Sequence, residues 1–271
     1  MIALVRSEWI KLRTTAVPWV LAAIALLITG LLILVYFVNH GDGGGGGPGG
    51  GGPGGGVGFG PPDPSVPHTV QQLRNLIGRG IEGYLFALLL GVLIITTEFR
   101  HKTVTTSFLV TPRRSTFVIA KLLMAAIAGL VLAIVVLVAT VVGGGITLSA
   151  KGGSFTALLH QVPAVAPGLI LVFVLFALLG VGVGSLLTNQ VAALIVSLGW
   201  FLVVENIIGA IWNGTTKWLP SGAAEAAASV TQRANSGVVL LQWWQGSLLI
   251  LAYGLFFAIV GSAVLTRRDI T

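Results

Sequence analysis

Six long apolar runs constrain the fold of this 271-residue sequence more than any other feature. Each is close to the ~20 residues that a helix needs to cross the ~30 Å hydrocarbon core of a bilayer. Charged residues make up only 8% of the chain, whereas they make up about 25% of a typical soluble domain. The sequence therefore predicts an all-α membrane protein with six transmembrane helices. We expect these spans at about Val17–Val38, Ile81–Thr97, Ile119–Val142, Pro163–Leu187, Val191–Ile211 and Ser247–Leu265.

The first run resembles a signal peptide only in its position. It is longer than the roughly 7–15 residues of a signal-peptide core, and no small-residue cleavage motif follows it. We expect it to be retained as a transmembrane helix.

Several classes of function find no support in the composition and motifs. The absence of cysteine excludes disulfides and thiolate chemistry. The net charge of +7 would suggest nucleic-acid binding in a soluble protein, but in a membrane protein basic loops orient the helices instead. The chain also lacks a Walker A motif, an H-E-x-x-H motif and a G-x-S-x-G motif. We therefore predict a protein that is not an enzyme, holds no cofactor or metal of its own and binds no nucleic acid.

The placement of Lys and Arg predicts the topology. Ten of these residues flank the spans on one side and five lie on the other, which has far more loop sequence. Because cytoplasmic loops carry the excess of Lys and Arg, we expect both termini and the loop Glu98–Lys121 to lie in the cytoplasm. The ten residues are Arg6, Lys11, Arg13, Arg100, Lys102, Arg113, Arg114, Lys121, Arg267 and Arg268.

Three segments outside the spans have a recognisable character. Ile2, Val5, Trp9 and Leu12 recur at helical spacing and predict an amphipathic helix in the membrane interface, the alternative being a charged tail without structure. Residues 39–75 are rich in Gly and Pro and predict a disordered external loop. Between the fifth and sixth spans, Pro220-Ser221-Gly222 is expected to break the chain, and Ala223–Ala228 has high helix propensity, so we expect one or two short external helices there. The whole chain, residues 1–271, then forms a single transmembrane domain.

Two features inside the spans invite interpretation. Gly180 and Gly184 are four residues apart and share a helix face, which favours close approach of a second helix. Glu205 is the only acidic residue well inside a predicted span. An ionised group at that depth costs at least a few kcal/mol unless it faces a partner or water. Glu205 therefore either lines a substrate path or subunit interface, or is a hydrogen-bonded structural residue near the outer rim.

The segment between the second and third spans, EFRHKTVTTSFLVTPRR, is the densest polar block of the chain. Pro112 ends any helix that precedes it. Val104, Phe108 and Leu109 then form an apolar face, opposite a polar face of Thr105, Thr106 and Ser107. We interpret the block as a short amphipathic helix in a cytoplasmic loop. An ordinary basic loop would explain the charges but not this apolar face.

This block also carries a resemblance to a known family. The pattern Glu98-x-Arg100-x-x-Thr103, followed by Leu109-x-x-Pro112-x-Arg114 and by Lys121, resembles the permease subunits of ABC-2-type ATP-binding cassette transporters. The start SEWIKLRT, the Val-Val-Glu of the fifth span and the terminus RRDIT are similar to that family too. The resemblance covers nearly the whole chain except the Gly-rich loop.

The resemblance implies a partner-driven exporter of a hydrophobic or amphipathic compound in the bacterial cytoplasmic membrane. The permease pairs with an identical or a sister permease, among membrane lipids, and two cytoplasmic ATPase subunits bind ATP and Mg. The loop between spans two and three then acts as a coupling helix on the ATPase. The residues that would carry this role are Glu98, Arg100, Thr103, Val104, Phe108, Leu109, Pro112 and Arg114. The rival interpretations are an ion-gradient-driven secondary transporter and a membrane regulator that transports nothing.

Cysteine labelling tests the predicted topology, because the chain has no cysteine of its own. We expect Ser65→Cys to react with an impermeant maleimide in intact cells, and Ser107→Cys to react only after permeabilisation. Labelling of Ser107→Cys but not of Ser65→Cys in intact cells would show that the orientation is reversed.

Overall fold

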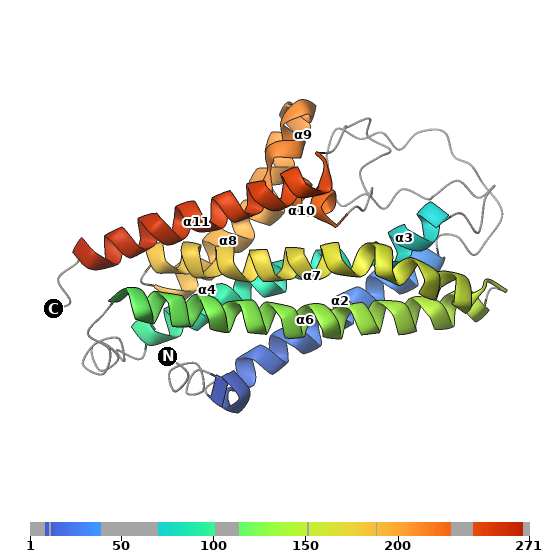
Figure 1. The fold of residues 1–271 in the computed structure, drawn as a ribbon, viewed down its shortest axis with the longest axis horizontal. Coiled ribbons are helices and arrows are strands. Elements are labelled where there is room, and N and C mark those ends of the chain that lie inside the picture. The colour runs from blue at the N-terminus through green and yellow to red at the C-terminus, as the bar shows by residue number, and fades with distance from the viewer. Residues whose placement is uncertain are drawn as a thin grey trace.

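The computed structural model describes residues 9–10, 12–38, 70–100, 114–150, 152–187, 189–228 and 241–267. All regular structure in these ranges is helical, and six of the helices are long and apolar enough to cross a membrane. The all-α fold class with six candidate spans is therefore confirmed. Figure 1 shows these helices as an elongated bundle with α7 near its centre.

The candidate spans use the following elements. The first is α2 (Ala16–Val38), and the second consists of α3 (Val70–Gly78), the 3₁₀ turn η1 (Arg79–Gly83) and α4 (Tyr84–Arg100). The third is α6 (Arg114–Ala150) and the fourth is α7 (Phe155–Leu186). The fifth joins α8 (Gln190–Gly199), the π-helical turn η2 (Trp200–Val204) and α9 (Glu205–Ile211). After η3 (Asn213–Trp218) and α10 (Pro220–Ala227), the sixth is α11 (Trp243–Arg267).

The second and fourth spans form the core of the bundle. In their most apolar windows 78% and 67% of the residues are buried, whereas the first, fifth and sixth spans have only 22%, 17% and 22% buried. The central helix α7 packs against α4, α6 and α11. The exposed side chains of α2 and α8, among them Leu27 and Ile195, are apolar and suit contact with lipid.

Glycine allows α4 and α7 to approach each other at backbone contact. A Cβ atom on Gly180 would collide with the carbonyl oxygen of Leu88, and one on Gly184 would lie 3.0 Å from the carbonyl oxygen of Val92. From the α4 side, Gly91 lies equally close to the backbone of Ala177. The predicted small-residue face on the fourth span is thus confirmed, and it is α4 that it contacts.

Three predicted boundaries were wrong, because Gly and Pro interrupt these helices less than expected. Helix α7 begins at Phe155 and continues through Pro163 and Pro167, and Ser154 caps it by accepting a hydrogen bond from the Ala157 N–H at 3.3 Å. Helix α6 continues past the predicted end at Val142 to Ala150. Helix α11 begins four residues before Ser247. Membrane-spanning helices tolerate Pro and Gly where neighbouring helices support the backbone.

The second span starts earlier than Ile81. Residues 70–75, which were predicted to belong to the external loop, are part of α3. Its apolar residues Leu73, Leu76 and Ile77 are buried against the bundle, while its polar residues made the segment look like a loop in sequence. The remainder of the predicted loop, residues 39–69, lies outside the described residues.

The smaller predicted elements are only partly described. Trp9, Ile10 and residues 12–14 are helical, but the rest of the predicted N-terminal interfacial helix lies outside the described residues. The predicted coupling helix lies outside them as well. The short helices η3 and α10 do lie between the fifth and sixth spans. Their placement on the external side stays a prediction. The expected break at Pro220-Ser221-Gly222 was wrong, because Pro fits the first turn of a helix and these residues begin α10.

The contact at Gly180 predicts a specific sensitivity to added volume. Gly180→Ala should destabilise the bundle by about 1–3 kcal/mol, because the Leu88 backbone must move to admit a methyl group. Gly30→Ala in α2 is the matched control, since nothing lies within 4 Å of that position. There the change should be neutral, or stabilising by up to about 1 kcal/mol. Thermal unfolding in detergent measures both, and equal stability of the two variants would contradict the close contact.

Candidate functional site

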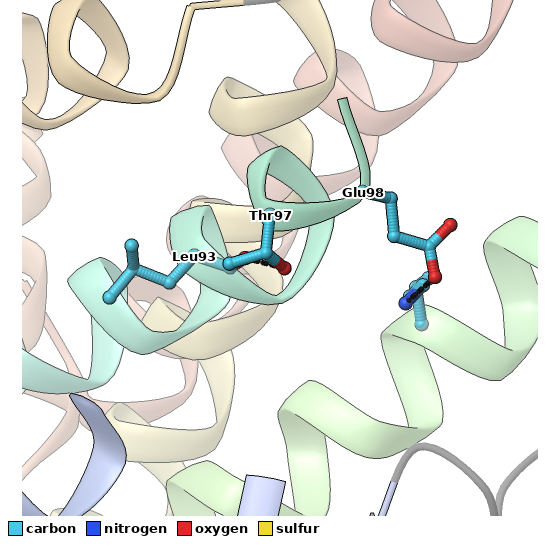
Figure 2. A network of polar contacts seen from close by, with 4 residues as sticks. Leu93, Thr97 and Glu98 are labelled. Carbon is cyan, nitrogen blue, oxygen red and sulfur yellow. Dashed lines mark hydrogen bonds and ion pairs between the residues drawn. The ribbon is translucent and has the colours of Figure 1, made fainter. Parts of the chain in front are cut away.

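The end of α4 carries a buried ion pair. The Lys121 Nζ of α6 donates to the Glu98 Oε1 at 2.6 Å, and only 2% and 5% of the two side chains are exposed. Figure 2 shows Glu98 extending from the last turn of α4 towards α6, with the dashed line marking the pair. The neighbouring Thr97 hydroxyl turns back to its own helix and donates to the Leu93 carbonyl at 2.7 Å.

The pair joins the last turn of α4 to α6, between residues 23 positions apart in the sequence. Burying either charge alone is costly, so the two side chains stay together once the helices pack. A buried pair contributes little net stability compared with an apolar replacement, but removing one partner costs several kcal/mol. The interaction therefore specifies how the last turn of α4 meets α6 seven residues after the start of α6 at Arg114.

Arg100, at the end of α4, contacts the fifth span. Its Nη1 donates to the Gln190 Oε1 of α8 at 3.4 Å. The bond is long and exposed, so it contributes little to stability. Asn189 starts α8 beside it by accepting hydrogen bonds from the N–H groups of Val191 and Ala192. The two predicted residues Glu98 and Arg100 thus connect one helix end to two different neighbours.

The other predicted coupling residues are not placed. Thr103, Val104, Phe108, Leu109 and Pro112 lie outside the described residues. Arg114 begins α6, but its side chain is also outside the described part. The structure therefore brings Glu98 together with Lys121, and the contacts of the six other predicted residues stay predictions.

Glu205 lies buried at the end of the π turn η2. Its backbone N–H bonds to the carbonyl of Trp200, five residues earlier, which is the π-helical spacing. The same spacing brings the two side chains together, and the Trp200 indole Nε1 donates to the Glu205 Oε1 at 3.1 Å. Glu205 is 4% exposed, although only 17% of the most apolar window of the surrounding span is buried.

The second carboxylate oxygen of Glu205 satisfies the start of α10. The Ser221 N–H donates to the Glu205 Oε2 at 3.2 Å. Leu219 precedes α10 and offers no capping side chain, and Pro220 occupies the first turn. The free N–H groups and the positive dipole end of a helix favour a carboxylate there. Glu205 therefore caps the first turn of α10 through Ser221, which follows it by sixteen residues.

Helix α10 is itself enclosed. All eight of its residues are buried, and it packs against α11 and α7. Small side chains make this possible, since Gly246 of α11 lies against the Ala223 carbonyl. Tyr253 of α11 also donates to the Trp218 carbonyl at 3.1 Å, just before α10. Glu205 thus helps to hold a short buried helix between the fifth and sixth spans.

These contacts bear on the two interpretations of Glu205. They are the hydrogen bonds that a structural glutamate requires, and they come from its own chain. A role in a substrate path or at a subunit interface stays a prediction. Among the described residues, no group of three His, Asp or Glu side chains gathers in a way that could hold a metal ion.

Sequence reasoning left Lys121, Trp200 and Ser221 out of the candidate site. The sequence could have identified Lys121, because a cation two residues inside a predicted span requires a partner. Glu98 directly follows the preceding predicted span and is the nearest acidic candidate in the sequence. No comparable signal pointed to Ser221, since its contribution is a backbone N–H presented by helix packing.

Comparison with known proteins adds no assignment: no protein-family model matches the chain, and no curated protein matches it.

The capping role of Glu205 predicts a local effect of substitution. Glu205→Gln should destabilise the protein by about 1–3 kcal/mol, because the amide cannot accept from both the indole and the Ser221 N–H without placing its own NH₂ group against a donor. Amide hydrogen exchange should then accelerate in α10. Asn206→Ala, which removes a bond from the exposed side of the same helix, is the control. Unchanged exchange in α10 together with altered transport would favour the substrate-path interpretation.

Proposed function

We propose that the chain is the permease subunit of an ABC-2-type exporter in the bacterial cytoplasmic membrane. It moves a hydrophobic or amphipathic compound, and two copies of a separate cytoplasmic ATPase bind ATP and Mg and supply the energy. The permease works as a pair with an identical or a sister chain. Both termini and the loop between α4 and α6 face the cytoplasm.

The buried pair of Glu98 and Lys121 is the observation that carries the proposal. A motor outside the membrane can move the spans only through a connection stiff enough to transmit displacement. The ion pair joins the last turn of α4 to α6 near its start, and these two helices flank residues 101–113, so a force on that segment acts on both helices together. Six apolar spans and a fold without strands in its described part are compatible with a permease.

The core contacts offer a route from this end of the bundle to the remaining spans. Helix α4 contacts α7 at backbone distance, and α7 packs against α11. A rigid displacement of α4 therefore shifts α7 with it, because closely packed helices do not deform independently. In this mechanism the chain catalyses no reaction. Its residues bind the ATPase and transmit the displacement to the spans that move the compound.

A second candidate, the ion-gradient-driven transporter, draws support from two interrupted spans. The turn η1 breaks the second span beside Arg79, and the π turn η2 breaks the fifth span beside Glu205. Interrupted helices with charged residues are typical of secondary transporters. Transport in inverted vesicles separates the two candidates, since export should require ATP and the ATPase subunit and should survive collapse of the proton gradient.

Copurification tests the coupling role of the predicted helix at residues 103–110. Phe108→Asp should reduce both ATPase recovery and transport at matched permease levels, because an unpaired charge at the contact is costly to bury. Thr106→Asp is the matched control: it adds the same charge to the predicted opposite face and should leave recovery intact. Full recovery and full transport with Phe108→Asp would refute the coupling role.

A further inference from the structure

The buried residues of the fifth span recur at every fourth position: they are Ala193, Ser197, Phe201 and Glu205. In an α-helix, residues four apart lie about 40° from each other around the axis, so an uninterrupted helix would place Glu205 about 120° from Ala193. The π turn η2 changes this position, because it holds one residue more than an α-helical turn and sets every later residue back by about 100°. Glu205 then lies only about 20° from Ala193, on the buried side of the span.

Helix α8, on one side of this turn, is attached to α4. The two helices pack together, and the first residue of α8, Gln190, accepts the bond from Arg100 of α4. Just after the end of α8, the Phe201 ring centre lies 6.0 Å from that of Tyr84, at the start of α4, and 5.6 Å from that of Phe176 on α7. Because both ends of α8 are attached to α4, we expect α8 to move when α4 moves.

Helix α9, on the other side of the turn, is held differently. It packs mainly against η2 and η3, its neighbours along the chain, and Figure 1 shows it projecting from the bundle away from α7. A Cβ atom added at Gly209 would meet only the Thr216 Oγ1 within 4 Å, at 3.4 Å. Rotation of α9 about its axis therefore meets little resistance from packing. The bonds that Trp200 and the Ser221 N–H of α10 donate to Glu205 oppose this rotation.

The sequence around η2 suits a second register of the same span. A π turn is rarer and less favourable than α-helix, and here the hydrogen bonds to Glu205 stabilise it. If η2 became α-helical, α9 would turn by about 100° and advance by about 1.5 Å. The apolar, half-buried Val204 would then take the buried position. Glu205 would turn to the side of the half-buried Leu194 and Leu198, where a carboxylate requires water or a polar partner.

We propose that η2 is a register switch in the fifth span. In the π register Glu205 binds the start of α10, and in the α register Glu205 is released from α10 and faces the substrate path. Its role rests on the proposed export function, because the ATPase supplies the displacement of α4 that carries α8 with it. The exchange between registers belongs to the permease alone, so it is measured without ATPase or substrate.

Fluorine NMR of the purified full chain in detergent tests the exchange. The protein has no cysteine of its own, so Ile207→Cys places a single trifluoromethyl label on the exposed side of α9. We expect two resonances, the minor one from the α register. Adding Glu205→Gln should raise the ratio of minor to major resonance about tenfold, because it weakens charge-assisted bonds that exist only in the π register. A label at Ile195→Cys, on the exposed side of α8, is the matched control and should give one resonance.

Deletion of Leu202 provides a variant without the switch. Leu202 is exposed, and its removal takes the extra residue out of η2 while Phe201 and Glu205 keep their buried positions. The label at Ile207→Cys should then give one resonance, and amide exchange in α10 should match the wild type. A second resonance that persists in this variant would overturn the switch. A single resonance at Ile207→Cys, both alone and with Glu205→Gln, would overturn it as well.

The role of the switch in export is tested separately from its existence. A copurified ATPase, trapped with ATP and vanadate, should increase the share of the α register at Ile207→Cys. If two registers exchange but the trapped ATPase leaves their ratio unchanged, the switch stands and the proposed ATP-driven export is contradicted.

Discussion

Two opposite charges are buried where the second and third spans meet, and each can be buried there only because the other is present. Lys121 and Glu98 are each almost fully covered, and neither is stable there without the other. Their 2.6 Å contact therefore fixes the register between α4 and α6 at one end of the bundle. Along the rest of α4, backbone contact with α7 at Gly180 continues this constraint into the core. A helix held in this way on two sides moves as part of a rigid unit.

The number of spans could be predicted because the bilayer demands it. A chain in hydrocarbon must satisfy its backbone within helices, so run length and hydropathy report the spans directly. The ends of the helices were harder to predict from the sequence, because they depend on packing against neighbouring helices. Pro163 marks the expected start of the fourth span, yet the helix begins at Phe155. The polar residues of α3 resemble a loop, yet its apolar face is buried in the bundle.

The sequence could predict that burying the Glu205 side chain is costly, but it could not predict which groups bind the side chain. Depth in the bilayer identified Glu205 as a residue that needs a partner. The partners it has in the structure depend on a π turn that aligns Trp200 and on a helix start presented by Ser221. Neither can be derived from hydropathy, because both require the fifth span and α10 to be packed. Tertiary contacts that involve a backbone N–H leave no mark in residue types.

A double-mutant cycle on the ion pair tests the central claim most directly. The free energy of unfolding is measured for the wild type, Lys121→Met, Glu98→Leu and the double variant. Each single change should cost about 3–5 kcal/mol because it leaves one buried charge unpaired, and the double variant should recover most of the loss. If the two changes add to within about 0.5 kcal/mol, the two residues act independently and the account of a rigid α4–α6 end is wrong.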